Sequence, residues 1–202
     1  MSRIATEEAV AEFRDRLCAA GGELFAEKGF EGFTMRELAG RLGISAMTPY
    51  RYFAGKDALM SEMRGRAFQR FADWLEIHLE GAQADQTALA HAFAQYAIKE
   101  PSQYRLMFVP VQPIPAISPL HAAQESRVRT MVADYLRAQL SRNRSSGDPE
   151  RLGIMFWSVL HGAGALYMAG TLSALEFAHA LCDVVLLFTG GSAKTSYGSV
   201  NA

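Results

Sequence analysis

The sequence lacks the residue patterns on which most enzymes and metal sites depend. It contains no G-x-S-x-G segment, no paired spacing of metal ligands and no glycine-rich loop of the kind that grips phosphate. Ser158 and His161 come closest to a nucleophile and its base, but no residue stands out that would orient the histidine. We therefore expect neither an enzyme nor a bound cofactor or metal.

Cysteine and net charge are also scarce. The two cysteines, Cys18 and Cys182, stand far apart at positions typical of a helical core, which favours a reducing compartment over a disulfide framework. We expect both to be buried, with redox sensing as the alternative. The net charge of −1 means that any affinity for DNA must come from a local patch. The N-terminus is polar and acidic and lacks a signal-peptide pattern, so we expect a cytoplasmic protein.

One long stretch has no charge at all. Residues 152–175 contain no Asp, Glu, Lys or Arg and are long enough to cross a bilayer. Four glycines, two serines, one threonine and His161 dilute the hydrophobicity, and no basic cluster flanks one side alone. The stretch is better explained as a buried helix, and we expect no membrane span. Because no strand pattern and no internal repeat occur either, the sequence predicts an all-α fold.

What the chain does have is a strong pattern at residues 34–56. Thr34 and Glu37 have the spacing of a capping box at the start of a short helix. Gly43 can supply the left-handed turn that ends this helix, and Ser45 or Thr48 can cap a second one that runs to Phe53. Two short helices joined in this way form a helix-turn-helix, whose second helix can enter a DNA major groove. The alternative is an ordinary helical hairpin.

The charge of this stretch favours DNA. Between residues 34 and 56 the chain has four basic residues and a single acid, Glu37, whereas residues 1–33 have seven acids and four bases. Positive charge is thus concentrated where a phosphate-facing surface would need it. Pro49 has no amide hydrogen, so the second helix should begin near Thr48 or start with a tight turn.

The run from Gly29 to Leu59, together with Phe25, resembles the amino-terminal DNA-binding domain of the TetR family of bacterial transcriptional regulators. The family pattern has an aliphatic residue where Pro49 stands. The positions that fall in register are Phe25, Gly29, Phe30, Thr34, Ala39, Gly43, Ile44, Ser45, Tyr50, Tyr52, Phe53, Lys56, Asp57 and Leu59. The resemblance implies a homodimer that binds double-stranded operator DNA and responds to a small-molecule effector.

We assign the DNA contacts by side-chain chemistry. Hydroxyl and ammonium groups are typical donors to phosphate, whereas arginine, methionine and small residues can read base edges. Expected phosphate contacts are Thr34, Thr48, Tyr50, Tyr52 and Lys56, expected base contacts are Arg36, Ala46, Met47 and Arg51, and Ser45 belongs to the same surface.

The rest of the chain reads as helices at 7–28, 57–79, 88–99, 101–109, 119–141, 150–170 and 173–189. We predict a three-helix DNA-binding domain at 1–56 and a six-helix ligand-binding and dimerisation domain at 57–189. A Gly/Ser-rich tail at 190–202 is expected to be disordered.

The second half carries its own resemblance. Residues 93–108 and 157–166 look like the ligand-binding domain of the TetR subgroup named for its Trp-His-Gly signature, here Trp157, His161 and Gly162. Trp157 and His161 share a helix face, where the histidine either packs in the core or contacts an effector. The candidates for an apolar pocket are Phe71, Phe93, Tyr96, Met107, Phe108, Tyr135, Phe156, Trp157 and His161, and plain core packing is the alternative for each.

The last two helices predict the dimer interface. Small residues crowd 162–170, and residues 181–188 are apolar on more than one face. A helix that is apolar all round must be buried, so we expect each chain to cover the other's last two helices. The sequence therefore predicts a ligand-responsive repressor that a small apolar or weakly polar effector releases from DNA by tilting helix 57–79. A helical scaffold with an incidental basic patch is the remaining alternative.

Overall fold

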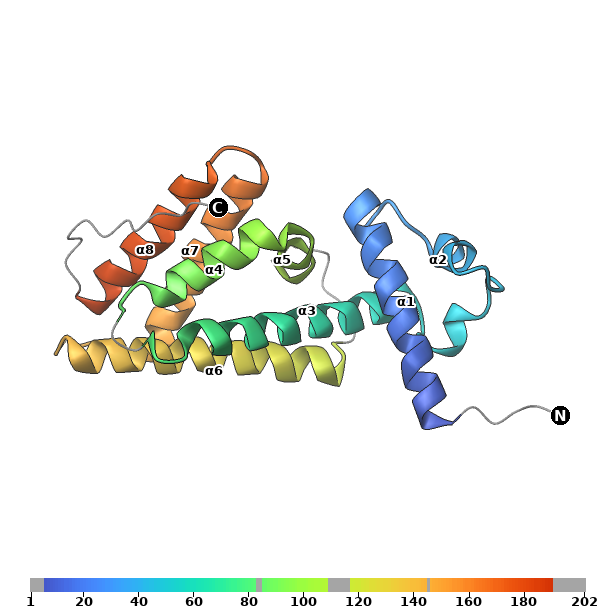
Figure 1. The fold of residues 1–202 in the computed structure, drawn as a ribbon, viewed down its shortest axis with the longest axis horizontal. Helices are drawn as coiled ribbons and strands as arrows, with labels where there is room; N and C mark the ends of the chain where they lie inside the picture. The colour runs from blue at the N-terminus through green and yellow to red at the C-terminus, as the bar shows by residue number, and fades with distance from the viewer. Residues whose placement is uncertain (1–5, 83–84, 109–116, 145, 191–202) are drawn as a thin grey trace. The chain divides into compact units, whose positions relative to one another are not determined.

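The computed structural model describes residues 6–82, 85–108, 117–144 and 146–190. Within these ranges the regular structure is helical throughout, as expected for an all-α fold (Figure 1). The helices are α1 (Glu7–Lys28), α2 (Met35–Arg41), the 3-10 helix η1 (Pro49–Arg51), α3 (Lys56–Leu79), α4 (Ala88–Lys99), α5 (Pro101–Phe108), α6 (Pro119–Arg142), α7 (Pro149–Met168) and α8 (Ala174–Thr189). Of the tail predicted at 190–202, only Gly190 belongs to the described residues, and 191–202 lie outside them.

Local signals explain where the helices begin and end. Asp148 accepts a hydrogen bond from the Glu150 amide at 3.0 Å, and Pro149 follows it as the first residue of α7. Ser173 and Glu176 form a capping box at the start of α8, which satisfies amide groups that would otherwise lack partners. Gly29 ends α1 with a φ of 70°, a conformation that costs glycine little.

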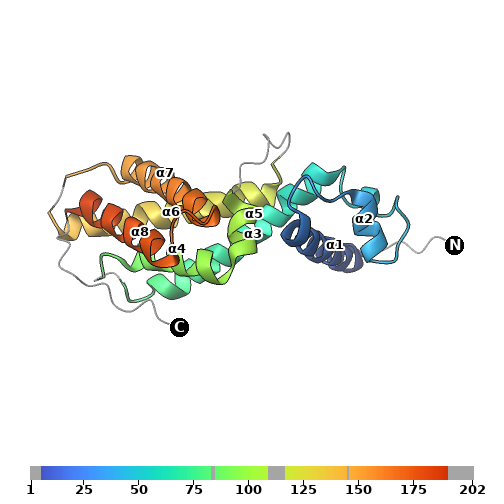
Figure 2. The ribbon, with the colours of Figure 1, turned by 90° about the horizontal axis from the view of Figure 1, so that it is seen from above.

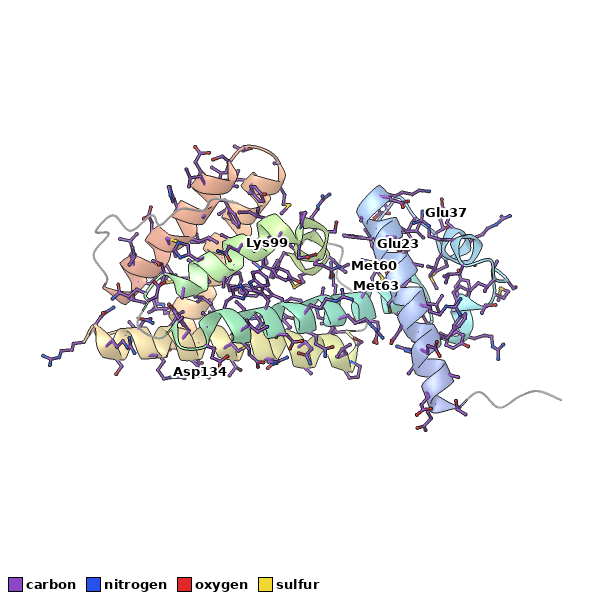
Figure 3. All side chains as sticks on the ribbon, in the orientation of Figure 1. Glu23, Glu37, Met60, Met63, Lys99 and Asp134 are labelled. Atoms are coloured by element: carbon purple, nitrogen blue, oxygen red, sulfur yellow. The ribbon has the colours of Figure 1, made fainter. Side chains whose placement is uncertain are left out.

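The described residues fall into two compact units. The first comprises residues 6–67 and 117–124, and so contains α1, α2, η1, the first part of α3 and the start of α6. Its core is apolar: Leu17, Leu24, Phe33, Leu38, Phe53 and Leu59 are each at most 3 % exposed. Helix α1 passes close to α3, where Met63 lies (Figure 3). The approach is so close that a Cβ added at Gly21 of α1 would lie 2.9 Å from the sulfur of Met63.

The second unit comprises residues 68–108 and 125–190, again within the described ranges. Helix α8 contacts both α4 and α7, and Figure 2 shows α7 and α8 running side by side. Arg127 of α6 bridges two carboxylates of α3, at 2.9 Å from Asp73 and 2.6 Å from Glu76. These contacts surround a core rich in aromatic side chains.

None of the described helices combines the length and the apolar character needed to cross a bilayer.

Candidate nucleic-acid interface and ligand site

The predicted capping box of the helix-turn-helix is present. The Thr34 hydroxyl accepts a hydrogen bond from the Glu37 amide at 3.2 Å, and the Glu37 carboxylate accepts one from the Thr34 amide at 2.8 Å. Gly43 adopts a φ of 65°, and the following amide, that of Ile44, donates to the Ala39 carbonyl at 3.0 Å. Ala39 is buried, so the turn closes over a small residue.

The second element of the motif is shorter than the helix predicted to reach Phe53. It is the single 3-10 turn Pro49–Arg51, with amides bonded three residues back: Thr48 to Ser45 at 2.9 Å, Arg51 to Thr48 at 3.1 Å and Tyr52 to Pro49 at 3.0 Å. Neither expected cap closes it: among the described residues, the Ser45 hydroxyl accepts from the Met47 amide at 3.4 Å, which precedes the turn, and the Thr48 side chain makes no capping bond. Pro49, which cannot donate, explains the tight turn. We call residues 45–53 the recognition segment.

One face of the recognition segment is open to solvent. Met47 is 69 % exposed and Tyr50 48 %, and Ser45, Ala46 and Arg51 are also exposed. Met47 and Tyr50 give this face apolar surface that a bound partner could cover. Arg36 on the neighbouring helix α2 is exposed as well. These side chains are therefore free to meet a partner.

Other predicted DNA contacts are partly engaged within the protein. Tyr52 is half-buried, with its ring 4.7 Å from that of Phe13. The Lys56 ammonium lies 4.3 Å from the centre of the Phe30 ring and 4.7 Å from that of Phe33. Thr48 is half-buried, and Thr34 is exposed but uses its hydroxyl in the capping box. Of this group, Lys56 contacts two aromatic rings, and such a contact does not neutralise its positive charge.

Arg41 contributes less to the local positive charge than the sequence count suggested. Arg41 pairs with two carboxylates of α1, at 2.7 Å from Glu27 and 3.4 Å from Glu23. The hydrogen bond from Arg41 lowers the pKa of Glu27, and the hydrogen bond from Lys28 lowers that of Glu37. Because its partners precede it by 14 and 18 residues, the neutralisation of Arg41 could not be read from residues 34–56 alone. Arg36, Arg51 and Lys56 supply the remaining positive charge.

Most of the predicted ligand-binding residues meet in one aromatic cluster of the second unit. The ring of Phe71 lies 4.7 Å from that of Phe93 and 4.8 Å from that of Tyr96. Phe93 lies 5.5 Å from Phe156 and 5.9 Å from Trp157, and Phe108 lies 5.3 Å from Trp157. Tyr135 is tied elsewhere, because its hydroxyl donates to the Asp85 carbonyl, and Met107 is buried.

His161 lies at the edge of the aromatic cluster. Its ring is 5.4 Å from that of Trp157, as expected for two residues that share a face of α7, and 4.8 Å from that of Phe108 on α5; both pairs are edge-to-face. Burial, reinforced by nearby Arg129, lowers the pKa of His161, so the ring is neutral at pH 7. The Ser158 hydroxyl donates to the Ile154 carbonyl at 2.9 Å, which is an ordinary helix contact rather than activation by a base.

Two clefts of the second unit reach the cluster. One of about 610 Å³ is lined by Tyr96, Trp74, Arg70, Lys99 and four further residues, and one of about 290 Å³ is lined by Trp157, Arg129 and six others. The Tyr96 hydroxyl is buried and has no hydrogen-bond partner among the described residues. Among all the residues that the structure describes, no group of three or more His, Cys, Asp or Glu side chains could hold a metal ion.

Comparisons with known proteins agree with this architecture. Residues 17–63 match the family described as "Bacterial regulatory proteins, tetR family", and residues 86–187, about half of the chain, match "Tetracyclin repressor-like, C-terminal domain". No curated protein matches the sequence significantly.

Several solved structures share the fold. A protein with unknown function from Rhodococcus sp. RHA1 is 22% identical with a TM-score of 0.72, covering 90% of this chain and 95% of its own. A TetR-family transcriptional regulator from Pectobacterium atrosepticum is 17% identical with a TM-score of 0.71, covering 94% and 98%. A tetR-family regulatory protein from Rhodococcus RHA1 is 18% identical with a TM-score of 0.66, covering 89% and 97%.

Proposed function

Because the chain belongs to the TetR family of bacterial transcriptional regulators, we propose that it is a cytoplasmic repressor that a small apolar or weakly polar effector releases from operator DNA. The observation that carries this proposal is the open face of the recognition segment. Met47, Tyr50 and Arg51 are exposed there on a scaffold fixed by a capping box and a glycine turn. The family consists of regulators rather than enzymes, so the enzyme alternative is set aside.

In the proposed complex, the recognition segment enters the major groove. Arg36, Ala46, Met47 and Arg51 contact base edges, while Tyr50 and Lys56 contact phosphates together with Thr34, Thr48 and Tyr52. Ser45 lies on the same exposed surface. A segment with so few outward side chains reads few bases, and a dimer that places two segments in successive grooves doubles that number.

We propose that the homodimer forms through α7 and α8. Leu166, Leu175 and Leu187 are 47 %, 51 % and 77 % exposed on these two helices, so α7 and α8 together offer apolar surface that a second chain could cover. Gly162 is exposed and a Cβ there would touch nothing, so a partner helix can approach it closely. Gly164 serves a different purpose: a Cβ there would lie 2.2 Å from the Tyr104 hydroxyl of the same chain.

The dimer proposal is tested with two matched variants. Leu187→Glu should give monomers in sedimentation equilibrium at micromolar concentration, because it places a charge in the interface core. Ile77→Glu, at a side chain that is 71 % exposed on α3, should leave the dimer intact. Monomeric wild-type protein at every concentration, or equal behaviour of the two variants, would refute an α7–α8 interface.

We propose that the effector binds at the aromatic cluster and its clefts, in a domain of the Trp-His-Gly subgroup. The cluster side chains are apolar apart from the Tyr96 hydroxyl, the Trp157 indole N–H and His161, which favours a ligand with one or two polar groups. Charged side chains, among them Arg70, Lys99 and Arg129, line the clefts. Binding there would shift the second part of α3, where Phe71 lies, and α3 continues into the DNA-binding unit.

The central experiment selects binding sites from a pool of random duplexes with the purified protein. Wild type should enrich a two-fold symmetric sequence, and its affinity should fall steeply with salt. Arg51→Gln should relax the preference at one base position, whereas Arg105→Gln removes an exposed arginine of α5 and should change nothing. Failure to enrich any sequence, or unchanged affinity in Tyr50→Ala and Lys56→Ala, would refute the DNA-binding assignment.

A further inference from the structure

We propose that Arg14 of α1 is a positioning residue that holds the recognition segment in register and connects it to α3. The proposal rests on the proposed DNA-binding function and adds to it a residue that would touch no DNA. Nothing in the sequence distinguishes Arg14 from Arg16, two positions later in the same helix. The distinction comes from the contacts of the Arg14 guanidinium.

The recognition segment is weakly held by its own backbone. A single 3-10 turn leaves carbonyl groups at its end without partners from the turn itself. One of them, the carbonyl of Tyr52, accepts a hydrogen bond from Nη1 of Arg14 at 2.7 Å. A bond from a charged donor is stronger than one between neutral groups, so Arg14 anchors the point where the segment ends.

The same guanidinium makes two further contacts that fix its orientation. Its carbon lies 4.3 Å from the centre of the Phe53 ring, and its Nη2 lies 3.3 Å from the carboxylate of Glu62 on α3. Phe53 is 3 % exposed, so the flat face of the guanidinium covers a core side chain. A planar guanidinium with several donors can stack on the Phe53 ring, donate to the Tyr52 carbonyl and pair with Glu62 at the same time. A lysine ammonium cannot reproduce this combination.

Glu62 connects Arg14 to a wider charge network. Arg66, one turn further along α3, lies 3.4 Å from Glu62 and 2.6 Å from Asp15 of α1. Positive and negative side chains alternate in the order Arg14, Glu62, Arg66 and Asp15. The first and last of these, Arg14 and Asp15, are consecutive residues of α1. The first turns of α3 are thus tied to α1 and, through Arg14, to the end of the recognition segment.

The adjoining face of α3 is held by α6. The Ser61 hydroxyl accepts from the Ser118 amide at 2.7 Å and lies 3.4 Å from Nδ1 of His121. Ser61 and Glu62 are consecutive residues, so a rotation of α3 that alters its contact with α6 also moves the carboxylate that Arg14 binds. We infer that Arg14 transmits the orientation of α3 to the Tyr52 carbonyl, and hence to the exposed residues of the segment.

The sign of one substitution separates positioning from simple charge. Glu62→Gln removes a negative charge from the DNA-binding unit, so electrostatics alone would tighten binding to every duplex. The positioning role predicts weaker binding, by about threefold, to the selected duplex only, because a neutral amide holds Arg14 less firmly. Tighter binding of both selected and scrambled duplexes by Glu62→Gln would overturn the proposal.

Arg14→Gln should lower affinity for the selected duplex by about tenfold, but for the scrambled duplex only as much as Arg16→Gln does, because both remove one positive charge. The salt slope should stay unchanged, because the proposal gives Arg14 no phosphate contact. Arg16→Gln is the matched control and should lose no selectivity. The double variant Arg14→Gln/Glu62→Gln should lose no more than Arg14→Gln alone, because the two residues act together. Additive losses, or equal losses on both duplexes, would contradict the assignment.

A readout without DNA keeps this proposal separate from the proposed function. Hydrogen exchange at the Tyr52 and Phe53 amides, which both bond the Pro49 carbonyl at 3.0 Å, should accelerate at least fivefold in Arg14→Gln and not in Arg16→Gln. If Arg14→Gln fails to fold, Arg14→Lys and Glu62→Gln carry the same measurement. Unchanged exchange in folded variants refutes the positioning role, whereas failure to select any duplex refutes only the DNA-binding proposal.

Discussion

A Cβ atom added to Gly65 of α3 would lie 2.7 Å from the backbone nitrogen of His121 in α6. That distance is well inside van der Waals contact, so glycine lets the two helices approach more closely than any other residue would. Along α3, Gly65 lies between Ser61, which accepts from the Ser118 amide, and Arg66, which pairs with Asp15, in the part of the helix that the proposal connects to the recognition segment.

We predict that Gly65→Ala destabilises the protein even though alanine favours helix. Overpacking against backbone atoms typically costs about 1–3 kcal/mol, more than the roughly 1 kcal/mol that alanine contributes over glycine in a helix. Gly22→Ala in α1 is the matched control, because a Cβ there meets nothing within 4 Å and should stabilise. Urea unfolding followed by circular dichroism measures both, and equal shifts in the two variants would contradict the close contact.

Lys56 should contribute to DNA binding and to stability at once. Lys56→Met is expected to weaken all duplexes alike and to reduce the slope of log K against log salt by about 1. It should also lower the free energy of unfolding by about 0.5–1 kcal/mol, through the lost contacts with Phe30 and Phe33. Lys99→Met removes a similar cation, 5.4 Å from the Trp74 ring in the second unit, and should leave DNA affinity unchanged.

His161 should make stability depend on pH in the weakly acidic range. Burial and Arg129 lower its pKa in the folded state, so the unfolded chain takes up the proton first as pH falls below about 6.5. Stability attributable to neutral His161 is therefore complete above that pH and is lost progressively as pH falls toward the folded-state pKa. The advantage of wild type over His161→Gln in urea unfolding should shrink from pH 7.5 to pH 5, and a constant or growing advantage would reverse the assigned sign.

Both thiols should be unreactive in the native protein. Burial raises the pKa of Cys18 to about 11 and that of Cys182 to about 12, and the side chains are 6 % and 3 % exposed. At pH 8 only about one thiol in a thousand or fewer would be ionised, so a disulfide reagent should react slowly. In 6 M guanidinium, on the order of the concentration that unfolds most domains, both should react at once. Rapid labelling of folded protein would revive the redox-sensing alternative.

Several helix ends outside the recognition segment could be predicted from the sequence because their signals are local. The pair Thr34 and Glu37, the turn at Gly43 and the Asp148–Pro149 start of α7 each lie within a few residues of the backbone groups they satisfy. The predicted helices at 7–28 and 88–99 have the observed bounds of α1 and α4. The two-domain assignment and the roles of individual site residues stay predictions, which the experiments above address.

The roles of residues that depend on tertiary contacts could not be predicted from the sequence. Arg41 looked like part of a basic surface until folding brought it to Glu23 and Glu27, and Arg14 looked like any helix arginine until it reached Tyr52. The small size of Gly164 suggested a helix interface between chains, yet it accommodates the Tyr104 ring. In each case the decisive partner is distant in sequence, where periodicity and spacing carry no information.

The side chains on the exposed face of the recognition segment contribute little to the packing of the protein itself. Met47, Tyr50 and Arg51 project outward, while Pro49, Phe53 and the anchored carbonyl of Tyr52 keep the backbone in place. Mutations at the outward positions can therefore accumulate without harm to folding. On the proposed function, exchange of two or three of these surface side chains would change which promoter the protein binds, while the rest of the molecule could evolve toward new effectors independently.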